Sequence, residues 1–176
     1  MEATKSLIIP GLYTISLSKF SDLRGESAQT FSEREYVFYD DNNSAIKFVE
    51  DDVSVSHYNV LRGLHGDDNT WKLIQCLWGE VFFVVVDMRP ESPAYLKWES
   101  FILNAVNRTQ VLIPAGCVNG HLCLSEKCMF SYKQSQYYGG ASKQITVKWD
   151  DPKFNIPWPV KQPLLSERDA TAAYLI

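Results

Sequence analysis

The chain has 176 residues, of which 45% are hydrophobic and 22% charged, and its formal net charge is -4. This length and composition are typical of a globular protein, and we expect residues 1–176 to form a single domain. The acidic balance argues against a nucleic-acid-binding surface, which depends on clustered Lys and Arg.

Short stretches of alternating or β-branched residues predict strands along most of the chain. We expect strands at residues 12–19, 45–52, 54–61, 71–78, 81–88, 95–104, 110–113, 121–124, 129–134 and 144–149. Residues 20–30 are expected to form a polar loop. Residues 31–38 are ambiguous, because Ser32 followed by Glu35 could cap a short helix of one or two turns.

Gly79-Glu80 is expected to make a tight hairpin turn, with glycine in the first position. A short helix is expected at residues 166–173, with Ser166 as N-cap and Asp169 at position N3. Many short strands with almost no helix predict an all-β sandwich or jelly roll.

The apolar patch near the N-terminus is cut by Pro10 and is too short for a signal peptide. No later apolar run is long enough to cross a bilayer. The four cysteines have neither C-x-x-C nor zinc-site spacing, so we expect reduced thiols. These features predict a cytoplasmic protein without a membrane partner.

The stretch from Val60 to Asp68 places Arg62, Gly63 and His65 within four positions. His65 is a candidate general base, although it could equally be an interior histidine. A base of this kind needs a carboxylate that stabilises its charged form. Asp67, Asp68, Asp87 and Asp169 all remain possible partners.

Three further residues could take part in proton transfer. Lys72 lies in a strand of otherwise uncharged residues, and it could stabilise a developing oxyanion if it points inward. Tyr132 and Tyr138 belong to an aromatic group in which one tyrosine could act as a general acid. The alternatives are a solvated lysine and tyrosines that pack within strands.

A catalytic metal is not expected, because paired histidine ligands are missing. The position two beyond His65 is Asp67, and the turn at Pro114-x-Gly116 leads to Asn119. His121 could be a residue of the core or of a strand edge.

Several segments, taken together, resemble the dTDP-4-dehydrorhamnose 3,5-epimerase family in order and spacing over nearly the whole chain. They are Val60-Leu-Arg-Gly-Leu-His65, Lys72-Leu, Gly79-Glu-Val-Phe82, Val86-Asp-Met-Arg89 with Ser92-Pro93, Asn107-Arg108, Ile113-Pro-x-Gly116, Tyr132-Lys133, Trp149-Asp-Asp-Pro152 with Ile156-Pro-Trp158, and Leu165-Ser-Glu-Arg-Asp169.

The resemblance implies a metal-independent, cofactor-free cupin jelly roll that forms a homodimer. It implies that His65 is the base, paired with Asp169, and that Lys72 stabilises the enolate oxygen. It also implies that Tyr132 returns a proton to the opposite face and that Tyr138 lines the sugar site. Arg62 and Arg24 would contact the diphosphate, with Arg24 reaching it from the partner subunit.

The sequence departs from the family pattern at positions expected to touch the sugar or nucleotide. The usual His-Gly is Asn119-Gly120-His121, and an aromatic-Gln pair is Gly66-Asp67. Gln29 replaces an acidic residue, and Phe83 replaces an Asp. The Q-x-N-x-S pattern is Glu50-x-Asp52-x-Ser54. The chemistry is therefore expected to be kept and the substrate altered.

These variants resemble epimerases that act on GDP-linked 4-keto-6-deoxy heptoses in capsule pathways. The expected activity is epimerisation at C3, C5 or both of a GDP- or dTDP-linked 4-keto-6-deoxy sugar, for bacterial surface polysaccharide. The alternatives are a 3,4-ketoisomerase, a sugar-nucleotide-binding barrel without catalysis, or a metal-dependent oxygenase. Nucleotide, sugar length and the carbon inverted stay open.

Overall fold

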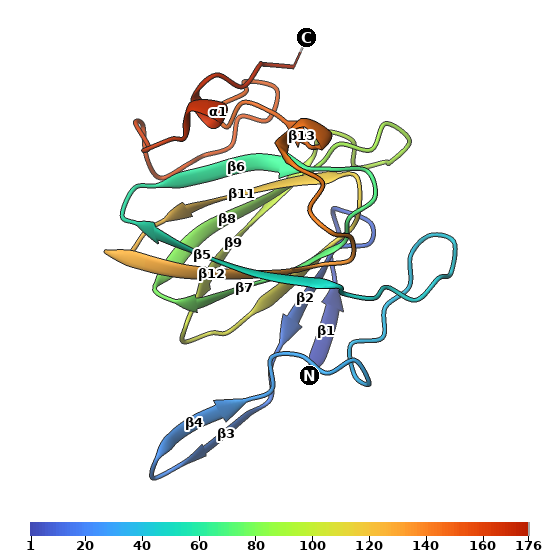
Figure 1. Cartoon of the computed structure of the whole chain (residues 1–176), viewed down its shortest axis with the longest axis vertical. Helices are drawn as coiled ribbons and strands as arrows, with labels where there is room; N and C mark the ends of the chain where they lie inside the picture. Colours follow the sequence, from blue (N-terminus) through green and yellow to red (C-terminus); the bar gives the residue numbers. More distant parts are fainter. Residues whose placement is uncertain (176) are drawn as a thin grey trace.

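The computed structural model describes residues 1–175, whose regular secondary structure is almost entirely antiparallel β-strand (Figure 1). The first sheet has six strands, in the order β1 (Glu2–Lys5), β2 (Tyr13–Ser16), β10 (Gln110–Ile113), β7 (Lys72–Trp78), β12 (Lys127–Gln134) and β5 (Glu50–His57). The second has five, in the order β13 (Ile145–Thr146), β6 (Leu61–Gly66), β11 (Cys117–Cys123), β8 (Glu80–Asp87) and β9 (Trp98–Asn104).

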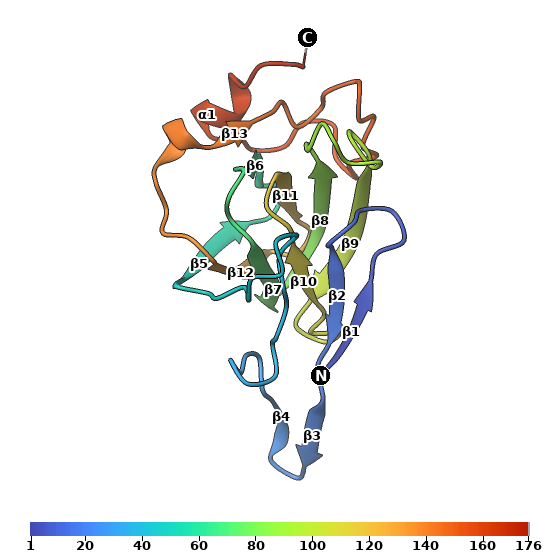
Figure 2. The same cartoon turned by 90° about the vertical axis from the view of Figure 1, so that its right-hand side faces the viewer.

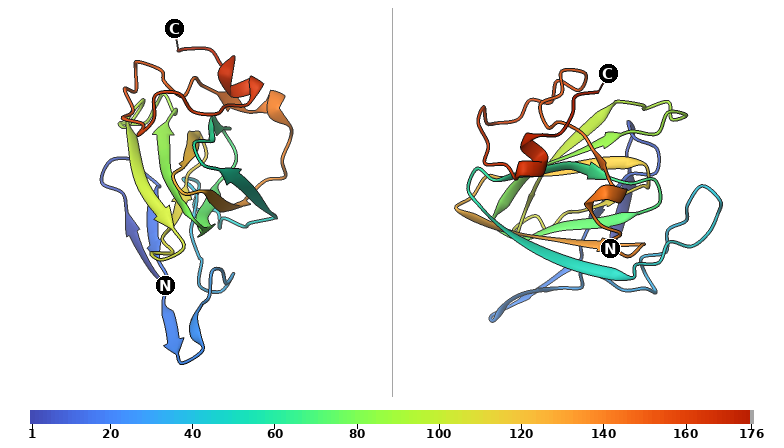
Figure 3. Two further views of the ribbon diagram at one scale, coloured as in Figure 1. Left: turned by 90° about the vertical axis from the view of Figure 1, so that its left-hand side faces the viewer. Right: turned by 45° about the horizontal axis from the view of Figure 1, so that its top comes forward.

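The two sheets face each other, as the two views of Figure 3 show, and the main hydrophobic core lies between them. Strand β8 is an unbroken apolar run because both of its faces are buried. Phe83 and Val85 point into the space between the sheets, whereas Val84 and Val86 pack on the other side. Phe154 and Trp158, from the segment after the last strand, cover that outer face. The predicted all-β sandwich is confirmed.

The C-terminal segment contains helix α1 (Glu167–Ala170), which lies over β6 (Figure 1). Ser166 is its N-cap and accepts a hydrogen bond from the backbone N–H of Asp169 at 3.2 Å, as predicted. The helix has four residues and is shorter than the predicted 166–173. A single turn suffices to bring Asp169 against β6.

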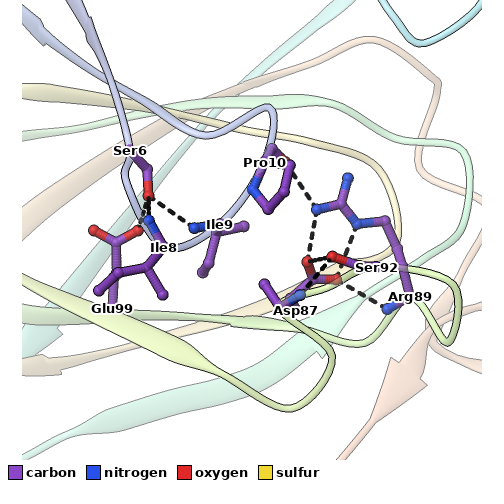
Figure 4. Close-up of polar contacts among 9 residues, drawn as sticks. Ser6, Ile8, Ile9, Pro10, Asp87, Arg89, Ser92 and Glu99 are labelled. Carbon is purple, nitrogen blue, oxygen red and sulfur yellow. Dashed lines mark hydrogen bonds and ion pairs between the residues drawn. The ribbon is translucent and has the colours of Figure 1, made fainter.

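Two polar clusters fix the loop between β1 and β2 against the second sheet (Figure 4). The Ser6 hydroxyl donates to Glu99 and accepts from the backbone N–H of Ile9. The Arg89 guanidinium donates to Asp87 Oδ2 at 2.7 Å and to the Pro10 carbonyl at 2.8 Å. The loop is therefore tied to the ends of β8 and β9.

Several predicted boundaries were wrong. Residues 20–30 form a hairpin of β3 (Lys19–Asp22) and β4 (Gly25–Ala28), which extends away from the sandwich (Figure 2). Its strands pair only with each other and expose most side chains, so they carry no buried alternation. The predicted strands at 45–52 and 54–61 are replaced by β5, and the Arg62–His65 motif belongs to β6.

Other differences follow from tertiary contacts. Residues 31–38, for which the sequence allows one turn or two, make one turn, in which the Tyr36 N–H donates to the Ser32 carbonyl at 2.9 Å. Strand β11 begins at Cys117 instead of residue 121, although it contains Asn119 and Gly120, because it pairs with both β6 and β8. Strands β9 and β13 are shorter than expected, β1 was not expected, and a 3-10 turn covers Ala141–Lys143.

Candidate active site

A cavity of about 550 Å³ opens between the two sheets, beneath the C-terminal segment. Its walls come from β5, β6, β7, β11 and β12, and from the residues around α1. Eight residues proposed from the sequence line it: Arg62, His65, Lys72, Asn119, His121, Tyr132, Tyr138 and Asp169.

Gly63 allows β6 to approach β11 closely enough to form the wall that carries His65. The backbone of Gly63 has φ of +128°, and a Cβ there would lie 2.5 Å from the Gly120 Cα. Any other residue would clash with β11 and would also be strained at this φ. The glycines on both strands thus determine where His65 enters the cavity.

His65 and Asp169 form the closest polar pair in the cavity. Asp169 Oδ1 lies 2.5 Å from His65 Nε2, and Asp169 is only 2% exposed. Burial alone would raise the pKa of Asp169, but the hydrogen bond and charge of His65 hold it below its ordinary value. An ionised Asp169 can orient the imidazole and stabilise its protonated form.

Lys72 projects from β7 into the cavity and is buried. Its ammonium donates to Asn119 Oδ1 at 3.3 Å. Burial lowers the pKa of Lys72, and the carboxylate of Asp67 opposes this shift. Within residues 1–175 this ammonium makes no other hydrogen bond, so it can also donate to a bound ligand.

Tyr132 lies on β12, in the sheet opposite the one that carries His65. Burial, followed by the charge of Asp52, raises the pKa of Tyr132. The phenol is therefore kept protonated at neutral pH. Tyr138 lies nearby, is 53% exposed, and donates its backbone N–H to Glu50 at 3.2 Å.

Arg62 and His121 complete the part of the wall formed by β6 and β11. The Arg62 guanidinium donates from Nε to Ser56 Oγ at 2.9 Å. The His121 ring stacks on Phe130, with the two ring centroids 4.0 Å apart.

Three residues proposed from the sequence lie outside this cavity. Arg24 is fully exposed in the β3–β4 hairpin, where it pairs with Asp22, and Gln29 is exposed just after β4. The Asp67 carboxylate accepts from the backbone N–H groups of Asn69 and Thr70, and it lines a neighbouring cavity of about 350 Å³.

The sequence interpretation missed several polar residues of the cavity. Arg168 is the most informative of them, because its guanidinium donates to Gln144 Oε1 and Thr146 Oγ1, each at 3.1 Å. Its place directly before Asp169 could have indicated it. Gln134, Gln144 and Ser166 also line the cavity, as does Ser54, which belongs to a segment expected from the family pattern to contact the substrate.

Among residues 1–175, no group of three or more His, Cys, Asp or Glu is placed to hold a metal ion. Within the same residues, no helix has the length and apolar character needed to cross a membrane. All four cysteines are buried and free.

Comparison with known proteins decides the family. The family described as dTDP-4-dehydrorhamnose 3,5-epimerase matches residues 6–176. The chain belongs to this family. The Salmonella typhimurium dTDP-4-dehydrorhamnose 3,5-epimerase is 38% identical over 171 residues, which cover 95% of this chain and 92% of the relative. The Shigella flexneri enzyme of the same name is 37% identical, covering 92% of this chain and 89% of the relative.

Solved structures give the same result for the fold. The Bacillus anthracis dTDP-4-dehydrorhamnose 3,5-epimerase, with TDP and PPi bound, superimposes with a TM-score of 0.90 at 31% identity, and 99% of each chain is covered. A Legionella pneumophila epimerase in complex with dTDP-4-keto-L-rhamnose gives 0.89 at 33% identity, covering 98% and 92%. The jelly-roll fold of the epimerase family and the expected isomerase class are confirmed: the chain is a nucleotide-sugar epimerase.

Proposed function

We propose that the chain inverts C3, C5 or both of a nucleoside-diphosphate-linked 4-keto-6-deoxy sugar, with His65 as the base. The observation that carries this proposal is the buried contact of 2.5 Å between His65 and Asp169. Lys72 and Tyr132 line the same cavity. We take residues 1–176 as one functional domain.

The 4-keto group acidifies the hydrogens on both neighbouring carbons, so the reaction needs a base, an acid and a group that stabilises the enolate. His65 removes the proton, and Asp169 stabilises the imidazolium that forms. The Lys72 ammonium donates to the enolate oxygen. The ketone itself supplies the activation, so the proposal includes no cofactor and no metal.

Inversion requires that the proton leaves from one face of the carbon and that another arrives on the other face. His65 belongs to β6 and Tyr132 to β12, which lie in the two sheets that enclose the cavity. A sugar held between these sheets would present opposite faces to the two side chains. Tyr132 is therefore assigned as the acid, and its raised pKa means that the phenol carries its proton at neutral pH.

Arg62 and Arg168 supply two guanidinium groups in the cavity for a diphosphate. The structures of relatives that contain TDP and PPi or dTDP-4-keto-L-rhamnose support a nucleotide-sugar ligand. Tyr138, Asn119 and His121 are proposed to contact the sugar, and Asp67 lies close enough to Lys72 to affect its charge. A GDP-linked heptose for capsule or O-antigen synthesis is one specific form of this proposal, and a dTDP-linked hexose is the other.

We also propose a homodimer in the cytoplasm. The β3–β4 hairpin of one subunit would carry Arg24 and Gln29 to the cavity of the other, which suits a hairpin that extends from its own sandwich (Figure 2). Four free, buried cysteines fit a reducing compartment.

The test is deuterium uptake from D2O by a panel of GDP- and dTDP-linked 4-keto-6-deoxy sugars, measured by mass spectrometry and NMR. The wild-type protein should place deuterium at C3, C5 or both. His65→Asn should reduce the rate by about 100- to 10,000-fold, which is the range for a general base. His57→Asn, which changes an exposed histidine, is the matched control.

Two alternatives give different results in the same experiment. A carbonyl that moves from C4 to C3 would identify a ketoisomerase. Binding without deuterium uptake, or uptake that survives in His65→Asn, would identify a binding barrel or a different base.

A further inference from the structure

The cavity contains two polar side-chain atoms that have no partner. Ser54 Oγ and His121 Nε2 are both buried and make no hydrogen bond within residues 1–175. Both residues line the cavity. None of the proton-transfer roles assigned to His65, Lys72, Tyr132 and Asp169 uses them.

These two side chains lie around the same aromatic residue. Ser54 on β5 is paired in register with Phe130 on β12, and the His121 ring stacks on Phe130 with an interplanar angle of 18°. Phe130 is itself held by Phe83 and Tyr132, at centroid distances of 5.7 and 6.2 Å. The His121 ring is therefore fixed in one plane.

A buried hydroxyl or imidazole nitrogen without a partner destabilises a protein, and most such groups in native structures are satisfied. Two of them around Phe130, one from each sheet that encloses the cavity, indicate that a bound ligand supplies the missing hydrogen bonds. The sequence supports this conclusion, because His121 follows the Asn119-Gly120 pair at which the chain departs from the family pattern.

The ligand group has to suit an uncharged imidazole. Burial lowers the pKa of His121 to about 3, and Arg62 and His65 add to this effect. A neutral imidazole has one N–H and one lone pair, and a serine hydroxyl both donates and accepts. A sugar hydroxyl can complete the hydrogen bond of His121 in either tautomer, whereas a phosphate, which only accepts, can do so only when Nε2 carries the proton, and a methyl group can do neither.

We propose that Ser54 and His121 form a hydroxyl-binding subsite, which selects a 4-keto sugar that carries a hydroxyl group on the side facing Phe130. This inference rests on the proposed function and goes beyond it, because it names a feature of the substrate. His121 acts here as a specificity-determining residue and takes no part in moving a proton.

The test uses four sugar probes, each linked to GDP and to dTDP: a 4-keto-6-deoxyhexose, its 2-deoxy and 3-deoxy analogues, and a 4-keto-hexose that keeps the 6-hydroxyl. Binding affinity and the kcat/KM of deuterium uptake are measured with each. The variants are His121→Phe, which keeps an aromatic ring against Phe130, and Ser54→Ala. His57→Phe is the matched control, because His57 is exposed on β5.

For the wild-type protein, one hydroxyl should improve affinity or kcat/KM by about 10-fold or more over the analogue that lacks it. That preference should fall below about twofold in His121→Phe and Ser54→Ala and should persist in His57→Phe. The preference for other hydroxyls should not change. This pattern separates recognition from a general loss of structure.

A preference that survives in both cavity variants, or a wild-type protein that discriminates none of the four probes, would overturn the subsite. A different result is expected if the proposed epimerase function is wrong. In that case none of the probes takes up deuterium in the presence of the wild-type protein. The binding measurements still show whether the two variants change the discrimination between the probes.

Discussion

The four residues assigned to proton transfer differ in the charge that the protein imposes on them. Asp169 is held as a carboxylate against His65, whereas burial disfavours the charged form of Lys72. Tyr132 is kept as a phenol. The cavity therefore brings together an ionised carboxylate, a buried lysine and a neutral proton donor, which are the groups that an enolate mechanism uses.

Lys72→Met should separate activity from stability. Loss of the ammonium should lower kcat by about 100- to 1,000-fold, because the enolate oxygen loses a charged donor. The free energy of unfolding should stay the same or rise, because an apolar side chain of similar length replaces a buried ammonium. Steady-state kinetics and urea denaturation measure the two effects.

A large loss of stability in Lys72→Met would show that the ammonium serves the fold instead of the reaction. Unchanged kcat would remove Lys72 from the mechanism.

At the scale of elements, two connections determine where the site residues lie. One is the close approach of β6 and β11, which depends on Gly63. The other is the polar anchor at the end of β8, where Asp87 accepts from the Arg89 guanidinium at 2.7 Å and from the Ser92 hydroxyl at 2.6 Å (Figure 4). Asp87 is fully buried, so this anchor should matter for stability.

Asp87→Ala should lower the free energy of unfolding at neutral pH by about 3 kcal/mol, because Arg89 loses its carboxylate in a largely buried setting. Burial alone would raise the pKa of Asp87, but Arg89 and Ser92 hold it below its ordinary value. The contribution is therefore fully present above the unfolded-state pKa of about 4 and is lost as pH falls through the lower folded-state pKa.

Urea denaturation of wild type and Asp87→Ala between pH 2 and pH 7 checks this prediction. The difference should shrink below about pH 4. The matched control is Asp22→Ala, because Asp22 forms an exposed ion pair with Arg24. This substitution should leave the midpoint of urea denaturation unchanged. A difference that is constant with pH would contradict the role given to the carboxylate charge.

The sequence predicted those elements whose pattern is local. Buried strands such as β7 and β8, and the N-cap at Ser166, carry their own periodicity or capping residue. The β3–β4 hairpin has no buried face, and β11 includes Asn119 and Gly120, whose strand conformation depends on two neighbouring strands. These elements could not be predicted from local pattern.

At the scale of the whole molecule, the site also combines residues that local sequence indicates with residues that only the fold brings together. His65 and Asp169 are 104 positions apart, and residue chemistry alone left four candidate carboxylates for the histidine. The family resemblance selected Asp169, and the fold places it in contact. Arg168 and Gln134 were missed because their roles depend on which way each turn or strand faces the cavity.

The position of Arg24, outside its own cavity, predicts complementation between subunits. Arg24→Ala and His65→Asn should each be nearly inactive alone. In a mixed dimer one cavity has an intact His65 and receives Arg24 from the other subunit. Random exchange between equal amounts should restore about a quarter of the wild-type activity, since half of the dimers are mixed and each has one complete site.

Activity after subunit exchange, together with mass from analytical ultracentrifugation, measures this effect. A mixture no more active than its components would contradict an Arg24 contribution across the interface, and a monomeric mass would contradict the dimer.

The central claim is that His65 and Tyr132 act on opposite faces of the same carbon, and Tyr132→Phe tests it most directly. In D2O this variant should still exchange the hydrogen at the reacting carbon for deuterium, because His65 can remove and return a proton on its own face. The recovered sugar should keep its original configuration, as NMR coupling constants would show. Inverted product formed by Tyr132→Phe at the wild-type rate would contradict the two-face mechanism.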